Sequence, residues 1–185
     1  MGLWPRTVQE WGSSAGERAL PFPCDALVSA PDAVLFRALD VDADAGIVFR
    51  WLCQLRLAPY SYDRLDNRGR RSPQTLTPGA DELEVGQRVM GIFTITSFEP
   101  GRSITMLSTG RLFGRVGVTY LAEPRSSSRS RLLVKMCVAY SASGLRGLPM
   151  RVLFPPGDLV MMRRQLLNFK ALAERTQRTR PAGAG

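Results

Sequence analysis

The spacing of apolar and polar residues changes along this chain, from an alternating pattern to a helical one. Apolar residues recur at about every second position in five segments: 33–41, 88–98, 103–109, 116–123 and 131–140. This alternation is typical of β-strands. Breaker residues such as Pro100 and Gly101 separate the later segments. Because these connections are short, we expect the strands to pair antiparallel in one sheet.

A helical pattern follows the first predicted strand. Asp42 or Asp44 can cap a helix that runs to about Leu57, with its apolar residues on one face. Pro59 then opens a segment that reads as a short second helix and ends at the breaker Gly69. We therefore expect two short helices between the first strand and the remaining strands.

A longer helical pattern occupies the end of the chain. We expect Asp158, which follows a Pro-Pro-Gly breaker, to cap a helix that runs to about Arg178. About 20 residues at 1.5 Å per residue make a rod of about 30 Å, which is long enough to cross a sheet. Its apolar stripe consists of Leu159, Met162, Leu166, Phe169 and Ala173.

These patterns together predict one α+β domain, in which a curved antiparallel sheet wraps around a long C-terminal helix. We expect an irregular N-terminal leader at 1–32, the domain at 33–178 and a disordered tail at 179–185. One helix against a twisted sheet leaves interior space that few large side chains can fill. An apolar pocket between the helix and the sheet is therefore expected, and pockets of this kind bind small apolar molecules.

Composition excludes several kinds of chemistry. The chain of 185 residues contains no histidine, which rules out Ser-His-Asp or Cys-His catalysis and histidine-ligated metals. Cys24, Cys53 and Cys137 form no CxxC pair, so we expect reduced thiols and no metal site. We expect no cofactor. No apolar run is long enough to span a bilayer and no signal-peptide pattern is present, so a cytoplasmic protein, monomeric or homodimeric, is the expectation.

The net charge of +9 makes nucleic acid a candidate partner. The arginines are scattered, however, and no cluster carries aromatic residues at stacking spacing. We therefore expect no specific nucleic-acid binding, and only weak attraction to anions.

Seven residues are candidates for contact with a ligand. They lie after the first strand and in the last helix: Trp51, Gln54, Tyr60, Tyr62, Met161, Met162 and Gln165. The methionines could form an adaptable wall, and the two glutamines lie at the polar edge of an apolar helix face. Core packing is the alternative interpretation for Trp51 and the methionines, and an aromatic plug that seats the turn is the alternative for Tyr60 and Tyr62. Lys135 lies between apolar neighbours in a strand, and we expect its ammonium group to reach solvent.

Several segments, in order along residues 20–175, resemble a known superfamily. They include LPFPCD (20–25), FRWLCQLRLAPYSYDRLDNRGRRSP (49–73) and GDLVMMRRQLLNFKALAER (157–175). The chain is similar to the SRPBCC, or helix-grip, superfamily, which includes START domains and the birch-pollen allergen, and within it to an actinobacterial polyketide cyclase-like group. It departs from that group at Arg64 and Pro156, where tryptophan is common. We therefore expect a wider or more cationic pocket mouth.

The resemblance implies a pocket that binds a small, largely apolar molecule of the lipid, polyketide or isoprenoid class. Because one scaffold carries several activities, an enzyme of the polyketide cyclase or aromatase type is the first alternative. A protein that binds nucleic acid or a membrane surface through its charge is the second. The sequence does not identify catalytic residues.

Overall fold

A six-stranded antiparallel sheet organises the computed structural model, which describes residues 4–110, 113–141 and 144–179. The spatial order of the strands is β1-β6-β5-β4-β3-β2, so the last strand pairs with the first. Their bounds are β1 Ala33–Val41, β2 Arg88–Val89, β3 Phe93–Glu99, β4 Ser103–Gly110, β5 Gly114–Ser126 and β6 Arg129–Ala139. Every pairing is antiparallel, as the short connections predicted.

The predicted strands are confirmed, with one division. The segment expected as a single strand at 88–98 forms both β2 and β3. Met90 and Gly91 separate them, with φ angles of 49° and 74°. Backbone in this left-handed region cannot continue an extended strand. The strand is therefore interrupted at these two residues, although the sequence keeps its alternating pattern on both sides of them.

The two short helices after the first strand are confirmed. Helix α3 spans Ala45–Cys53 and continues as the 3-10 turn η2, Gln54–Arg56, and helix α4 spans Asp63–Asp66. Asp44 caps α3 by accepting a hydrogen bond of 2.9 Å from the backbone N–H of Gly46.

The last helix is longer than predicted. Helix α5 runs from Gly144 to Thr179 and includes Pro155 and Pro156, so the expectation that Asp158 begins it is wrong. The carboxylate of Asp158 instead pairs with Arg37 on β1, at 2.7 Å. The partner of Asp158 is 121 positions away along the chain, and no local cap signal could reveal it.

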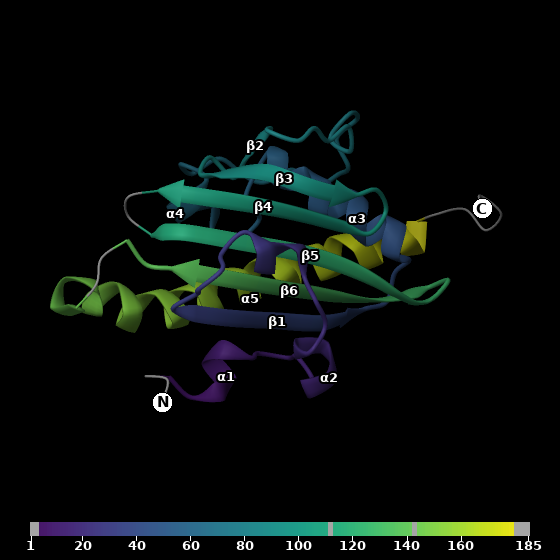
Figure 1. Cartoon of the computed structure of the whole chain (residues 1–185). Helices are drawn as coiled ribbons and strands as arrows, with labels where there is room; N and C mark the ends of the chain where they lie inside the picture. The colour runs from purple at the N-terminus through teal and green to yellow at the C-terminus, as the bar shows by residue number, and fades with distance from the viewer. Residues whose placement is uncertain (1–3, 111–112, 142–143, 180–185) are drawn as a thin grey trace.

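The apolar stripe of α5 faces the sheet as predicted (Figure 1). Met162, Leu166, Phe169 and Ala173 are buried, and Leu159 is partly buried. The opposite side carries Arg164, Ala171 and Arg175, which are all exposed.

The leader runs beside the β1 edge of the sheet and then crosses the other, convex face (Figure 1). It contains three one-turn helices: α1 Arg6–Gln9, α2 Ala15–Arg18 and η1 Pro23–Ala26. The N–H of Ala38 on β1 donates to the carbonyl of Trp11, which covers part of the free edge of the sheet. Turn η1 packs over Gly117, where an added Cβ would lie 3.2 Å from Leu27 and 3.3 Å from the carbonyl of Cys24. A side chain at this position on β5 would push the leader away.

No helix of the described ranges is long and apolar enough to cross a membrane. Of the tail predicted at 179–185, Thr179 ends α5, and residues 180–185 lie outside the described residues.

Candidate functional site

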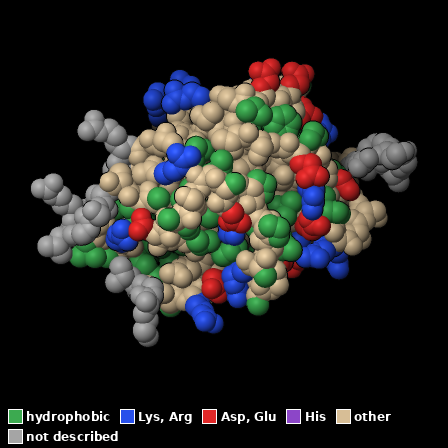
Figure 2. All heavy atoms as spheres, in the orientation of Figure 1, with side chains coloured by type: hydrophobic (Ala, Val, Ile, Leu, Met, Phe, Trp, Pro, Cys, Tyr) green, Lys and Arg blue, Asp and Glu red, His purple; other side chains and the backbone are tan. Residues whose placement is uncertain are grey.

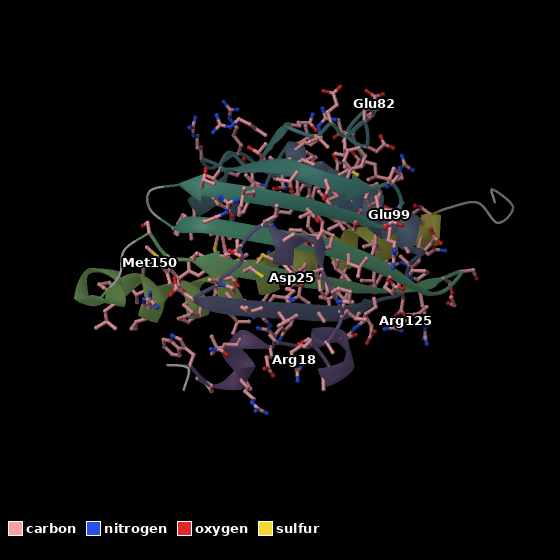
Figure 3. The ribbon with its side chains drawn as sticks, in the orientation of Figure 1. Arg18, Asp25, Glu82, Glu99, Arg125 and Met150 are labelled. Atoms are coloured by element: carbon pink, nitrogen blue, oxygen red, sulfur yellow. The ribbon has the colours of Figure 1, made fainter. Side chains whose placement is uncertain are left out.

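A cavity of about 440 Å³ lies between the N-terminal half of α5 and the concave face of the sheet. Most of its wall is apolar, with contributions from three strands and the helix: Phe93, Val116, Val118, Met136, Phe154 and Met162. Side chains on alternate positions of β5 and β6 point into this layer because a strand presents every second residue to one face. Met150, near the start of α5, also lines the cavity and lies toward one end of the molecule (Figure 3).

The cavity has a polar floor made by two fully buried side chains. The hydroxyl group of Tyr120 donates to Oε1 of Gln165 at 2.7 Å, and Nε2 of Gln165 donates to the carbonyl of Pro59 at 2.6 Å. Burial raises the pKa of Tyr120, and the nearby charge of Asp158 raises it further, so the phenol stays neutral. Its oxygen keeps acceptor capacity for a donor on a ligand.

A turn of unusual backbone geometry supports this floor. Tyr60 has a φ angle of 57°, in the left-handed region. Its carbonyl accepts from Nδ2 of Asn168 at 2.7 Å, while the preceding carbonyl of Pro59 accepts from Gln165. Two consecutive carbonyl groups are therefore bound to α5, and the segment is held against the helix.

A buried ion pair borders the cavity beside the floor. Asp158 lines the cavity, and its side chain is 6% exposed, while that of Arg37 is 1% exposed. Arg37 also donates from Nη1 to the carbonyls of Gln9 and Phe36, at 3.0 and 2.8 Å. Burial raises the pKa of Asp158, although the charge and hydrogen bond of Arg37 act in the opposite direction. A buried carboxyl group with a raised pKa therefore lies at the cavity wall.

The structure brings together three of the seven predicted site residues. Met161, Met162 and Gln165 line the apolar cavity. Trp51 lies elsewhere, because α3 packs against the C-terminal half of α5, where the indole N–H donates to Oγ1 of Thr176 at 3.0 Å.

The other three predicted residues also lie outside the cavity. Nε2 of Gln54 donates to the carbonyl of Thr75 at 2.9 Å, and the residue is fully buried. Tyr60 and Tyr62 line a second hollow on the other side of the segment that contains Ser61. The helical periodicity placed Trp51 on an apolar face and Gln54 at its edge, but it carried no information about which half of α5 that face meets. Tyr60 and Tyr62 were candidates because alternate side chains of one segment can point into one space.

Sequence reasoning did not assign Tyr120, Arg37 or Asp158 to the site. Tyr120 reads as an ordinary aromatic strand residue, and only the pairing of β5 with its neighbours turns it inward. The position of Arg37 could have indicated a buried ion pair, because a charged residue within an alternating apolar strand needs a buried partner if it faces the core.

A different cluster lies on the convex face, under the leader. Cys24, Asp25 and Cys137 hold their sulfur and carboxylate atoms within 4.8 Å of one another, which the wide spacing of the cysteines does not reveal. Nζ of Lys135 lies 2.6 Å from a carboxylate oxygen of Asp25, the residue labelled in front of the sheet in Figure 3. The side chain of Lys135 is only 11% exposed, so the expectation that it reaches solvent is wrong. The ammonium group of Lys135 is paired with the carboxylate of Asp25. We therefore interpret this cluster as a contact that holds η1 against the sheet.

No protein-family model matches the chain, and no curated protein matches its sequence. Solved structures do. A hypothetical protein of Helicobacter pylori is 14% identical over 84% of this chain and 96% of its own, with a TM-score of 0.52. The Zhui aromatase/cyclase of Streptomyces sp. R1128 is 18% identical over 82% of this chain and 98% of its own, with a TM-score of 0.44.

The di-domain ARO/CYC BexL of the BE-7585A biosynthetic pathway is 14% identical over 76% of this chain, with a TM-score of 0.49. Our chain spans 46% of that di-domain chain. At these identities the likeness shows the fold alone.

Proposed function

We propose that this chain, whose fold is the helix-grip fold expected from its sequence, binds a small, largely apolar molecule in the cavity between α5 and the sheet. The cavity itself is the observation that supports the proposal. Its volume of about 440 Å³ falls within the range of about 300–1,000 Å³ typical of ligand pockets. Its wall is apolar except for the Tyr120–Gln165 floor and a few groups at its margin, which fits an apolar molecule with one polar substituent.

The test uses a neutral fluorescent probe, N-phenyl-1-naphthylamine, so that the net charge of the protein does not contribute to binding. The probe should bind the wild-type protein and gain fluorescence as water leaves its surroundings. Met162→Trp fills the cavity and should abolish this gain, at a cost in stability of about 1–3 kcal/mol from overpacking. Leu167→Trp is the matched control, because Leu167 lies on the same helix, is 40% exposed and is absent from the cavity wall.

Binding by Met162→Trp at wild-type affinity would refute the proposal. Loss of binding in both variants would also count against it, because the control leaves the cavity unchanged. Circular dichroism confirms that each variant is folded before binding is measured.

The polar floor gives a second measurement. The double variant Tyr120→Phe with Gln165→Leu removes both hydrogen-bonding side chains of the polar floor. It should weaken the binding of 1-naphthol by about tenfold and leave 1-methylnaphthalene nearly unchanged, since one hydrogen bond contributes about 1 kcal/mol or somewhat more. Equal effects on both compounds would mean that the floor does not contact the ligand.

A second candidate function is proton-transfer catalysis of the polyketide cyclase or aromatase type. The observation that favours it is Asp158, a buried carboxyl group with a raised pKa at the wall of an apolar cavity. Groups of this kind serve as general acids or bases. Asp158→Asn should then abolish formation of an aromatic product from a poly-β-ketone analogue, measured by absorbance, while binding of the neutral probe persists. No product from the wild-type protein would leave binding as the function.

A further inference from the structure

A second hollow, of about 600 Å³, lies between α5 and the segment at 60–74. Four arginines line it: Arg64 from α4, Arg71 from the loop after α4, and Arg164 and Arg175 from α5. We call this hollow the arginine cleft.

The spacing of residues along α5 explains how one side of the cleft forms. Arg164, Asn168, Ala171 and Arg175 follow one another at intervals of four, three and four residues, so they share one face of the helix. The small Ala171 leaves space between the two guanidinium groups, whose backbone positions are about 16 Å apart along the helix axis. The cleft is therefore elongated, and one end lies beside Gln165 and the apolar cavity.

The arginines of the cleft differ in their ion pairing from many other basic side chains of this protein. Arg102 pairs with Glu99 and Glu123, and Arg131 pairs with Glu17. On the face that the leader covers, acidic and basic side chains are intermixed (Figure 2). By contrast, the lining residues Arg64, Arg71 and Arg164 form no ion pair with any residue of the described ranges.

Among the described residues, Asp63 is the one carboxylate in the wall of the cleft, and neutral donors hold it in place without cancelling its charge. Asp63 accepts hydrogen bonds from the N–H of Ser72 at 2.9 Å and from its hydroxyl group at 2.6 Å. Arg175 donates to the carbonyl of Gln74, which is neutral, so its charge is not cancelled. Four arginines against one carboxylate leave the wall of the cleft with a net positive charge, and the walls concentrate the resulting field.

We propose that the arginine cleft binds the phosphate group of an anionic ligand. Guanidinium groups match phosphate geometry with paired N–H donors, and they remain charged at every physiological pH. Arg64 and Arg164 are the pair we assign to the phosphate, because they line the cleft from α4 and α5 and neither forms an ion pair with a described residue.

Two sources could supply this phosphate. One is a free phosphorylated molecule held by the cleft alone. The other is an amphipathic molecule whose apolar tail enters the neighbouring cavity, since Ser61 lines both hollows and they share a wall there. Only this second source rests on the function proposed above.

Isothermal titration calorimetry with two probes separates the sources. Inorganic pyrophosphate represents the free phosphate, and dodecyl phosphate, kept below its micellar concentration, represents the amphipathic one. Titration at about 150 mM NaCl limits long-range attraction, because the Debye length is then about 8 Å. The test protein carries Arg64→Gln with Arg164→Gln.

The matched control carries Arg125→Gln with Arg129→Gln. Both residues lie at the β5–β6 hairpin and are exposed, and Figure 3 shows Arg125 at the opposite end of the molecule from Met150. The two double variants therefore have the same net charge, and thermal melting checks that both are folded.

If the site is correct, the affinity of the cleft variant for whichever probe binds falls by about tenfold or more, as expected for charge-assisted hydrogen bonds. The affinity of the hairpin variant changes by less than about threefold. Pyrophosphate binding supports the free source. Binding of dodecyl phosphate alone, lost also in Met162→Trp, supports the amphipathic source. Equal losses in the two double variants, or no binding of either probe by the wild-type protein, would overturn the proposal without bearing on binding of the neutral probe.

Discussion

The buried pair of Arg37 and Asp158 allows a quantitative prediction for the variant Arg37→Met. Methionine fills similar apolar space but leaves the carboxyl group of Asp158 without a partner in the interior. Removal of one member of a buried ion pair typically costs about 3–5 kcal/mol. The exposed pair of Arg129 and Asp42, whose side chains are 73% and 66% exposed, provides the control, and Arg129→Met should cost less than about 1 kcal/mol.

The effect of pH follows from the same ion pair. Burial already raises the pKa of Asp158, and Arg37 is the group that opposes it, so Arg37→Met raises the pKa further. In the unfolded chain the carboxyl group titrates near 3.9. A group whose pKa is higher in the folded state contributes stability below the unfolded pKa, and this contribution is lost as pH rises toward the folded pKa. The variant should therefore be nearest to wild-type stability at about pH 4 and fall behind it up to about pH 7.

The size of the electrostatic loss has a ceiling. Protonation of a carboxyl group with a pKa near 3.9 costs about 1.4 kcal/mol for each pH unit above that pKa, or about 4 kcal/mol at pH 7. The folded variant can always protonate Asp158 at this cost instead of burying its charge. The loss should therefore grow by up to about 4 kcal/mol between pH 4 and pH 7 and then level off at the folded pKa.

Urea denaturation followed by circular dichroism measures these differences at each pH. The double variant Arg37→Met with Asp158→Leu should recover most of the lost stability at neutral pH, because it leaves no unpaired charge in the interior. A loss below about 1 kcal/mol in Arg37→Met at neutral pH, or a loss that does not change with pH, would refute the assignment of this pair to the interior.

Three further predictions concern the core, the leader and the surface charge. Phe169→Ala should cost about 3–5 kcal/mol in urea denaturation, because the ring is 0% exposed; a cost below about 1 kcal/mol would mean that α5 is not docked on the sheet. Burial raises the pKa of Glu17, but hydrogen bonds from Arg131 and Ser14 outweigh it and lower the pKa from 4.5 to about 2. Its stabilisation is therefore present above pH 4.5 and lost as pH falls toward 2, and Glu17→Gln should flatten the acid dependence of the melting temperature; an unchanged slope would contradict this. Binding to DNA should disappear between about 50 and 200 mM salt in a filter assay, and sequence-dependent binding that survives would show a dedicated nucleic-acid site.

The strands and the faces of the last helix could be predicted because each depends on a short repeating pattern. On β6, Leu132, Val134 and Met136 face the concave core, and Leu133 and Cys137 face the leader, as the alternation predicted. A strand that is buried on both faces needs a cover on each side. The sequence therefore contained evidence that the leader packs on the domain, although it did not show which leader residues make the contact.

The site was less predictable because it depends on how elements meet. Met161, Met162 and Gln165 could be chosen because they follow one another on a helix that had to face the sheet. Trp51 satisfied the same reasoning and nevertheless lies at the other half of α5. A helical period gives the direction of a side chain around its axis, and it gives no information about the position along the partner element.

The sequence by itself determined the class of fold, since the order of the elements and their apolar faces allow few ways to bury them. It also determined that no histidine chemistry takes place in this chain. Only the tertiary structure decided that Asp158 is a buried partner of Arg37 instead of a helix cap, and that Tyr120 meets Gln165 under the cavity. It likewise gathered arginines 64, 71, 164 and 175 around one hollow. Contacts between residues that are distant along the chain depend on which strands pair and on where each helix lies along the sheet, and a helical or alternating period does not give either property.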